Sequence, residues 1–366
     1  MKIEYAESVG EYLSLIKKES NLYETRVGDH LEPEVLWFRG FDYTGHPLIP
    51  SLFREKNLVN GLELENPYTK LHYAEDIRTQ HYVAKNYHFF SKIPSSRVEW
   101  LEVMQHHEVK TRLLDWSESS MHSLIFALEA FLDGKKYSTE QRRKQVPCVC
   151  VLRPQVLNLN ILKYLYEKQD FVRELLKELG CTSQEEIDIL KQLEKNWDLI
   201  ADKKSGERKS LEGINHLSCI FNLSTINDEL YRDRTRLKEM LKKGEIFTFF
   251  YLLSRIYSDG YILKERVLPP LAVVQPYHSE RIKLQKGVFT VFPYYEEKKW
   301  DEVLREAGIE RNAMQYNEIC QKALFKIELM KPEEMAYELI SNGINTSWLY
   351  PELPIVANEI ESHKAY

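Results

Sequence analysis

Apolar residues in the N-terminal part of the chain recur first at helical spacing and then as a continuous run. Ser8 and Glu11 have the spacing of a capping box, so we expect a helix to begin near Ser8. The apolar stripe of this helix consists of Tyr12, Leu13 and Ile16. The run at 35–40 predicts a short buried strand that delivers Arg39 and is stopped by Gly40.

Residues 68–90 form a longer segment with helical periodicity. Apolar residues and histidines fall at steps of three or four on one face, namely Leu71, Ala74, Ile77, His81, Ala84 and His88. We therefore expect His81 and His88 on the core side of this helix. The histidines of the chain do not have the spacing of an HExxH motif, so both are interpreted as hydrogen-bonded core residues.

A second capping box, Ser96 with Glu99, predicts another helix. Near its C-terminal end lie three polar residues, Gln105, His106 and His107. Residues 111–116 then form a turn or a short extended piece. We expect the next helix to start at Ser117, because strongly periodic apolar positions follow it.

Alternating or continuous apolar residues predict strands in the rest of the chain, at 146–152, 270–275, 281–284, 288–292 and 324–329. Cys148 and Cys150 share one face of the first of these strands. Residues 155–265 are instead rich in helix formers and charges, which indicates a helical insertion. A last helix should open at Pro332 and close near Gly343.

Together these elements predict an α+β fold, with a small mixed or antiparallel sheet as the core, flanking helices and a large helical insertion. We divide the chain into three parts. Residues 1–154 form the N-terminal part of the core, 155–265 the insertion or subdomain, and 266–366 the C-terminal part of the core.

Composition and charge remove several classes of protein. The chain has 366 residues, a net charge of −6, 14 glycines and 14 prolines, which does not fit a collagenous or disordered protein. Its acidic balance and short basic stretches do not suit a nucleic-acid partner. Charges interrupt the N-terminal segment, and no apolar run approaches the ~18 residues of a membrane span. We therefore expect a cytoplasmic protein with no membrane partner.

Short motifs with a known mechanism are missing from the sequence. The 5 cysteines include no CxxC pair, and HExxH and paired metal-binding carboxylates are also absent, so we expect no bound metal and no required cofactor. GxSxG and GxGxxG do not occur either. Any chemistry must therefore come from residues that are distant in the sequence.

Four signatures occur in order along the chain: WFRG at 37–40, QHHEVKTRLLDWSES at 105–119, RIKLQKGVF at 281–289 and GINTSWLYPEL at 343–353. Over nearly the whole chain they resemble the FRG domain, a bacterial family named after its Phe-Arg-Gly motif. Glu108 and Lys110 stand where the family pattern has glycine and proline, which leaves the geometry of this turn open. We expect WFRG, TRLLDW and LQKGVF to meet in space, because polar groups inside apolar runs need partners.

A more distant resemblance links the chain to ADP-ribosyltransferases. In that fold an early strand that ends in Arg-Gly or His-Gly holds NAD, and a late strand carries a catalytic glutamate shortly before a Gly-x-Phe segment. Residues 35–40 and 281–289 are similar to these two strands. Either Glu280 or Gln285 lies nearest to the position of the glutamate.

These resemblances imply a cleft that handles a nucleotide. Arg39 would hold a pyrophosphate in bidentate fashion beside Gly40, and an internal salt bridge to Asp115 is the alternative. The ligand-binding candidates are Arg39, Gly40, Gln105, Arg112 and Asp115, and the catalytic candidates are His107 as acid or base and Gln285 as a partner of a ribose hydroxyl. For Arg112 and Asp115 an ion pair that fixes their loop is the favoured role.

The implied function is the binding of an NAD-like nucleotide as ligand or substrate, with ADP-ribosyl transfer or NAD hydrolysis as the activity. The competing hypothesis is a non-catalytic sensor or interaction module, for instance in bacterial stress or phage defence, in which the same residues join loops. A metal-dependent hydrolase is a third hypothesis. The ligand, the target, the oligomeric state and the role of the insertion stay open at this stage.

Overall fold

The computed structural model describes residues 1–20, 25–27, 30–32, 34–54, 67–90, 93–94, 96–132, 146–167, 173, 176–177, 180–200, 221–222, 239, 242, 257, 269–274, 279–293 and 314–350. Within the predicted insertion, most of 201–265 lies outside these residues. The division of the chain at 154 and 265 stays a prediction.

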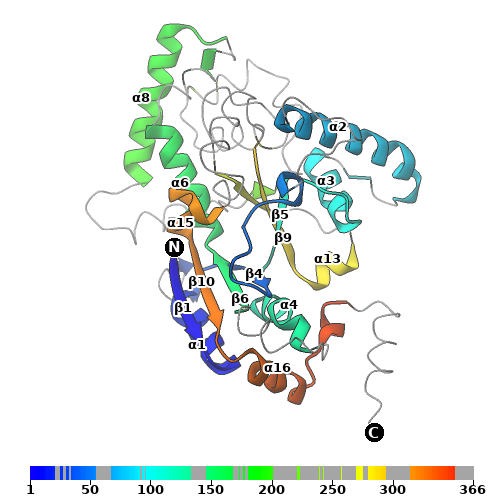
Figure 1. Cartoon of the computed structure of the whole chain (residues 1–366). Coiled ribbons are helices and arrows are strands. Elements are labelled where there is room, and N and C mark those ends of the chain that lie inside the picture. The colour runs from blue at the N-terminus through cyan, green and yellow to red at the C-terminus, as the bar shows by residue number, and fades with distance from the viewer. Residues whose placement is uncertain are drawn as a thin grey trace.

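A mixed sheet of 8 strands forms the centre of the molecule, in the order β1-β10-β6-β4-β5-β9-β8-β7 (Figure 1). The strands are β1 Lys2–Ala6, β4 Trp37–Phe41, β5 Leu113–Ser117, β6 Cys148–Leu152, β7 Phe221–Asn222, β8 Leu271–Val274, β9 Gly287–Val291 and β10 Leu324–Leu329. The pairs β1–β10 and β7–β8 are parallel, and the other neighbours are antiparallel. A separate hairpin joins β2 Thr25–Val27 to β3 His30–Glu32. The expected α+β class is confirmed.

Helices cover both faces of this sheet. They are α1 Val9–Ser20, α2 Pro67–Asn86, α3 Arg97–His106, α4 Ser120–Leu132, α6 Pro154–Glu167, α8 Ser183–Ile200, α13 Glu280–Leu284, α15 Glu318–Ala323 and α16 Pro332–Ser341. Short 3₁₀ helices are η2 Ser51–Arg54, η3 Tyr87–Phe89, η6 Met314–Tyr316 and η7 Thr346–Trp348. Apolar side chains of α1, α4 and α16 share one core cluster, and those of α3, α6 and α15 share another.

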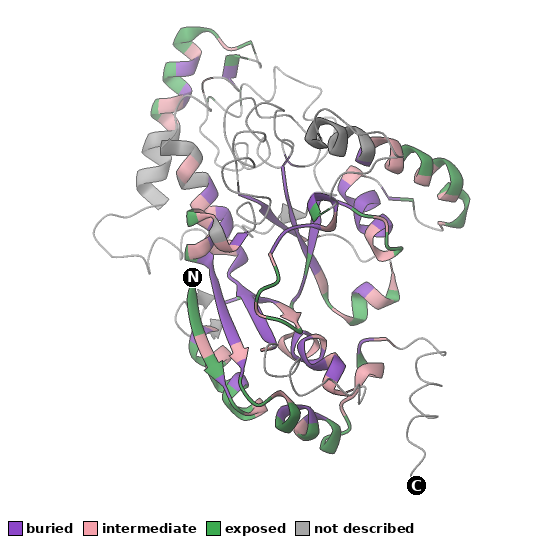
Figure 2. Ribbon diagram, in the orientation of Figure 1, coloured by how far each residue is buried: buried purple, intermediate pink, exposed green. Residues whose placement is uncertain are grey.

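Strand β6 shows how the alternation in the sequence builds these two cores. Cys148 and Cys150 belong to the cluster with α3 and α6, while Val149 and Val151 belong to the cluster with α4. All residues of β6 are buried, which Figure 2 shows as a continuous buried strand in the middle of the sheet. The prediction that both thiols lie on one face of a strand is therefore confirmed.

Local capping signals placed several helices correctly. The Ser8 hydroxyl accepts a hydrogen bond from the backbone N–H of Glu11 at 3.1 Å, and α1 begins directly after Ser8, at Val9. Ser96 accepts the corresponding bond from Glu99 at 3.2 Å. Within α1, Tyr12 is buried, whereas Leu13 from the expected apolar stripe is exposed.

One predicted strand boundary is wrong, and one predicted strand is a helix. Strand β4 does not stop at Gly40 but continues through it to Phe41, because β6 supplies pairing partners for both residues. Residues 281–284 form the helix α13 instead of a strand. The cause is local, since the Ser279 hydroxyl accepts a hydrogen bond from the N–H of Ile282 at 3.1 Å and caps a helical turn.

The predicted start of α4 is also wrong. Ser117 is the last residue of β5, and the helix begins at Ser120. The Ser119 hydroxyl accepts a hydrogen bond from the N–H of His122 at 3.3 Å, so Ser119 supplies the N-terminal cap. The apolar face of α4 lies on β4 and β6 as expected, with Leu124, Ile125 and Leu128 buried.

The orientation of α2 differs from the prediction. His81 and His88 are exposed, and among the side chains of residues 75–86, which the structure describes, the fully buried one is Glu75. Burial of a carboxylate requires a charged or hydrogen-bonded partner. That partner, Arg112, comes from a distant segment, so the periodicity of the helix alone pointed to the wrong face.

Candidate functional site

Three of the sequence motifs meet at the centre of the sheet. Phe38 of β4 pairs with Ser117 of β5, and Asp115 of β5 pairs with Phe289 of β9. The motifs WFRG, TRLLDW and LQKGVF are thus neighbours in space, as predicted. Strand pairing therefore places these segments at one site.

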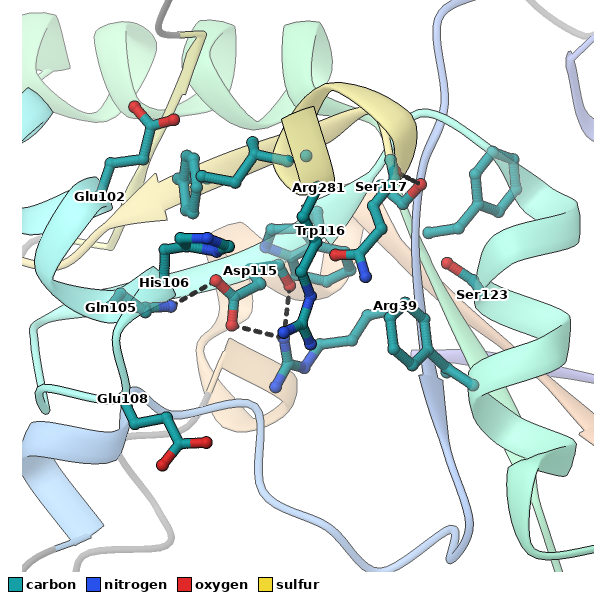
Figure 3. Close-up of a pocket in the computed structure, with 17 residues that line it drawn as sticks. Arg39, Glu102, Gln105, His106, Glu108, Asp115, Trp116, Ser117, Ser123 and Arg281 are labelled. Atoms are coloured by element: carbon teal, nitrogen blue, oxygen red, sulfur yellow. Dashed lines mark hydrogen bonds and ion pairs between the residues drawn. The ribbon is translucent and has the colours of Figure 1, made fainter. Parts of the chain in front are cut away.

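A cleft with a volume of about 320 Å³ opens beside these strands (Figure 3). The α3 side contributes Glu102, Gln105, His106 and Glu108. The strands contribute Phe38, Arg39, Gly40, Asp115, Trp116, Ser117, Gly287 and Phe289. Helix α4 adds Ser123 and Phe126, helix α13 adds Arg281 and Ile282, and Gln285 follows α13. Aromatic walls with a few charged and amide groups are typical of ligand sites.

Arg39 and Asp115 form the central polar contact of the cleft. Nη1 of Arg39 donates to the backbone oxygen of Asp115 at 2.6 Å and lies 3.4 Å from its carboxylate oxygen Oδ2. The guanidinium also lies over the ring of Phe41, 5.1 Å from its centre. Among the described residues, the buried Nε of Arg39 has no hydrogen-bond partner. The salt bridge that the sequence offered as the alternative is therefore present, and Nε makes no hydrogen bond within the described part of the chain.

Asp115 is held in turn by Gln105. The Gln105 amide nitrogen donates to Oδ1 of Asp115, and its oxygen accepts from the hydroxyl of Thr111. The Thr111 oxygen also accepts from the N–H of Leu113 at 3.2 Å. These contacts fix the carboxylate, so Gln105 acts on the cleft through Asp115 as well as by lining it.

Gly40 allows α4 to lie directly against β4. A Cβ atom at this position would stand 2.0 Å from the backbone oxygen of Ser123 and 2.7 Å from the nitrogen of Ala127. No side chain can replace glycine without moving the helix backbone. This close approach brings Ser123 beside the cleft, where its buried hydroxyl has no partner among the described residues.

Gln285 is the residue that follows α13 and lies in the cleft. Its Nε2 donates to the backbone oxygen of Leu349 at 2.9 Å, and its own backbone oxygen accepts from the Ser117 hydroxyl at 2.6 Å. The guanidinium of Arg281 lies 4.6 Å from the ring centre of Tyr350. The described part of the fourth motif, 343–350, thus reaches the cleft through contacts with α13 and the residue after it. Glu280, the other candidate for the glutamate position, does not line the cleft.

The structure brings together five of the predicted site residues: Arg39, Gly40, Gln105, Asp115 and Gln285. His107 is not among the lining residues, and its ring lies 6.3 Å from that of Tyr82. His106 lines the cleft in its place. The spacing of Glu102, Gln105 and His106 by three and four positions puts them on one face of α3, and this signal was available in the sequence.

Arg112 is also absent from the cleft, because it is fully buried in an ion pair with Glu75. Its Nε lies 3.2 Å from one carboxylate oxygen of Glu75, and its backbone N–H donates to the other at 2.9 Å. Nη1 donates to the backbone oxygen of Phe292 at 2.9 Å. Burial raises the pKa of Glu75 and lowers that of Arg112. The expected ion pair is present, but its partner is Glu75 and not Asp115.

The turn after α3 keeps a left-handed backbone although it contains no glycine. Glu108 has φ of 63°, and the N–H groups of Glu108 and Val109 donate to the oxygens of Gln105 and Met104 at 3.0 and 2.9 Å. These two bonds are those of a Schellman motif, in which the residue at this position is usually glycine. Glu108 therefore takes the left-handed conformation that is usual for glycine at this position.

No group of three or more histidine, cysteine, aspartate or glutamate side chains that could hold a metal ion occurs among the described residues. The absence of a bound metal stays a prediction. Of the helices in the described part of the chain, none has the length and apolar character needed to cross a membrane.

Comparison with known proteins supports the family resemblance for part of the chain. Residues 34–136 match the family model of the FRG domain. This stretch runs from just before β4 to just beyond α4, and therefore supplies Arg39, Gln105 and Asp115. No curated protein and no solved structure matches the chain.

Proposed function

We propose that the cleft binds an NAD-like nucleotide through an anionic group held by Arg39. The observation that carries this proposal is the set of hydrogen bonds that the Arg39 guanidinium makes. Asp115 occupies Nη1, and Nε is buried with no partner among the described residues. The Nε and Nη2 groups form the second edge of the fork, which suits two oxygens of a phosphate.

Other cationic groups support the binding of an anion here. Arg281 lines the same cleft. Arg54 lies near Arg39, since its pKa is lowered first by burial and then by the positive charge of Arg39. Positive charges that converge on a concave, partly apolar site attract anionic ligands.

The proposed reactions are ADP-ribosyl transfer and NAD hydrolysis. In both, the bond between nicotinamide and ribose breaks, nicotinamide leaves with the bonding electrons, and a nucleophile adds to the ribose carbon. The Leu349 backbone oxygen accepts from the amide nitrogen of Gln285, and in this proposal the amide oxygen accepts from a ribose hydroxyl. His106 is better placed in this cleft than His107 for an acid or base role.

Calorimetry with NAD and ADP-ribose, combined with product analysis, tests this proposal. Arg39→Lys keeps the positive charge and removes the fork, so affinity should fall by about ten- to a hundredfold. Arg173→Lys is the matched control, because Arg173 pairs with Glu186 at 2.6 Å and does not line the cleft. Absence of nucleotide binding by the unmutated protein would refute the proposal.

A second candidate is a non-catalytic sensor or interaction module, as in bacterial stress or phage defence in the cytoplasm. The chain of contacts from Arg39 through Asp115 and Gln105 to Thr111 favours it, because these bonds join β4, β5 and α3. In that case Arg39→Lys should lower the thermal midpoint, and no nucleotide should bind or react.

A further inference from the structure

The backbone at the end of α3 is strained at a residue that lines the cleft. Glu108 adopts φ of 63°, a conformation that disfavours side chains with a Cβ atom. Hydrogen bonds from its own N–H and from that of Val109 hold the turn in this form. The strain cannot relax unless the end of the helix changes.

The chain itself contains the relaxed version of this turn. Gly343 follows the C-cap of helix α16 with φ of 71°, and the N–H groups of Gly343 and Ile344 donate to the backbone oxygens of Ile340 and Leu339, both at 2.9 Å. The hydrogen-bond pattern is the same as at α3, with glycine in the place of Glu108. Glycine would adopt this backbone conformation at position 108 without strain. The presence of a strained glutamate there points to a role for its side chain.

Charges in the cleft indicate what that role is. Figure 3 shows Glu102, Gln105, His106 and Glu108 along one side of the cleft, with the contact between Arg39 and Asp115 next to them. The Arg39 guanidinium already balances the charge of Asp115. The exposed carboxylate of Glu108 therefore adds negative charge to the wall beside an anion site.

We propose that Glu108 is a specificity-determining residue, which selects ligands that carry a positive charge in addition to the anionic group held by Arg39. This inference rests on the proposed nucleotide site. A carboxylate attracts a cationic ring that lies several ångströms away. The same ring without a charge gains no such Coulomb energy. NAD and NADH provide such a pair, because the nicotinamide ring is cationic in the first and neutral in the second.

The test is the ratio of the dissociation constants of NADH and NAD, measured by calorimetry for three proteins. The unmutated protein should bind NAD about five- to tenfold more tightly than NADH, the size expected for unit charges in a partly exposed cleft. Glu108→Gln should bring this ratio close to one. Glu108→Gly should do the same and raise the thermal midpoint by about 1–3 °C, since it relieves the strained turn.

Lys286→Gly is the matched control. Lys286 follows α13 with φ of 48°, its N–H donates to Lys283 at 3.1 Å, and it does not line the cleft. This variant should also raise the midpoint, but leave the ratio of the two affinities unchanged. Binding of both dinucleotides with a ratio that Glu108→Gln does not alter overturns this inference alone. Binding of neither overturns the proposed function and this inference with it.

Discussion

Arg39 and Asp115, 76 positions apart in the sequence, are joined by Nη1 of the guanidinium, which donates to the backbone oxygen of Asp115 at 2.6 Å. The carboxylate contributes a longer contact of 3.4 Å, and the Asp115 side chain is 52% exposed. Most of the link is therefore made by the main chain of β5. The carboxylate remains accessible to solvent and to a ligand.

Asp115→Asn should change stability very little. An exposed ion pair contributes less than about 1 kcal/mol, and the bond to the backbone oxygen survives the substitution. We expect the free energy of unfolding in urea to fall by less than about 1 kcal/mol. A loss of several kcal/mol would show that the carboxylate is a structural partner of Arg39.

Arg112→Ala should have the opposite outcome. Arg112 and Glu75 are both fully buried, and removal of Arg112 leaves the buried carboxylate, among the described residues, with only a longer ionic contact of 3.7 Å to Arg97. We expect a loss of about 3–5 kcal/mol in the free energy of unfolding, or failure to fold. The double variant Arg112→Met with Glu75→Met should recover much of this loss, because it removes both charges. A double variant that is less stable than Arg112→Ala would contradict this account.

Gly40→Ala should disrupt the packing of α4 on β4. The added methyl group would stand 2.0 Å from the backbone oxygen of Ser123, which can move only with its helix. We expect a loss of at least about 1–3 kcal/mol in stability, as for overpacked cores. Gly10→Ala in α1 is the control, since its Cβ would meet only Ser8, at 3.9 Å, and it should stabilise the protein by about 0.5–1 kcal/mol.

Glu34 should make stability depend on pH. It is buried beside Arg153, whose Nε donates to it at 3.0 Å, and burial raises the pKa of Glu34 to about 7. The folded protein thus holds this proton more tightly than the unfolded chain, where the pKa is about 4.3. The stabilisation from this proton is complete below about pH 4 and is lost as the pH rises through about 7.

The measurement is the free energy of unfolding of the unmutated protein and of Glu34→Gln between about pH 4 and pH 8. As the pH rises over this range, the free energy of unfolding of the unmutated protein should fall by up to about 3 kcal/mol relative to that of Glu34→Gln. Glu318→Gln, at an exposed position of α15, serves as the control. A difference that stays constant, or moves the other way, would contradict the assignment.

Sequence patterns were reliable at several places where the deciding interactions are local, although the local caps at Ser279 and Ser119 were missed. The capping box of Ser96 and Glu99, the alternation of Cys148 with Cys150, and the helix opened by Pro332 all involve residues within a few positions of one another. The family motifs likewise indicated which segments form a site. They did so because polar groups in apolar segments need partners.

Tertiary structure decided other features, for reasons that a single segment does not contain. Helix α2 turns Glu75 inward and His81 outward because Arg112, 37 positions away, provides the compensating charge. Strand β4 continues through Gly40 because β6 pairs with it and α4 needs the space that a side chain would fill. Partners of buried charges and neighbours of strands are set by long-range packing, whereas caps and alternation are set by the local backbone.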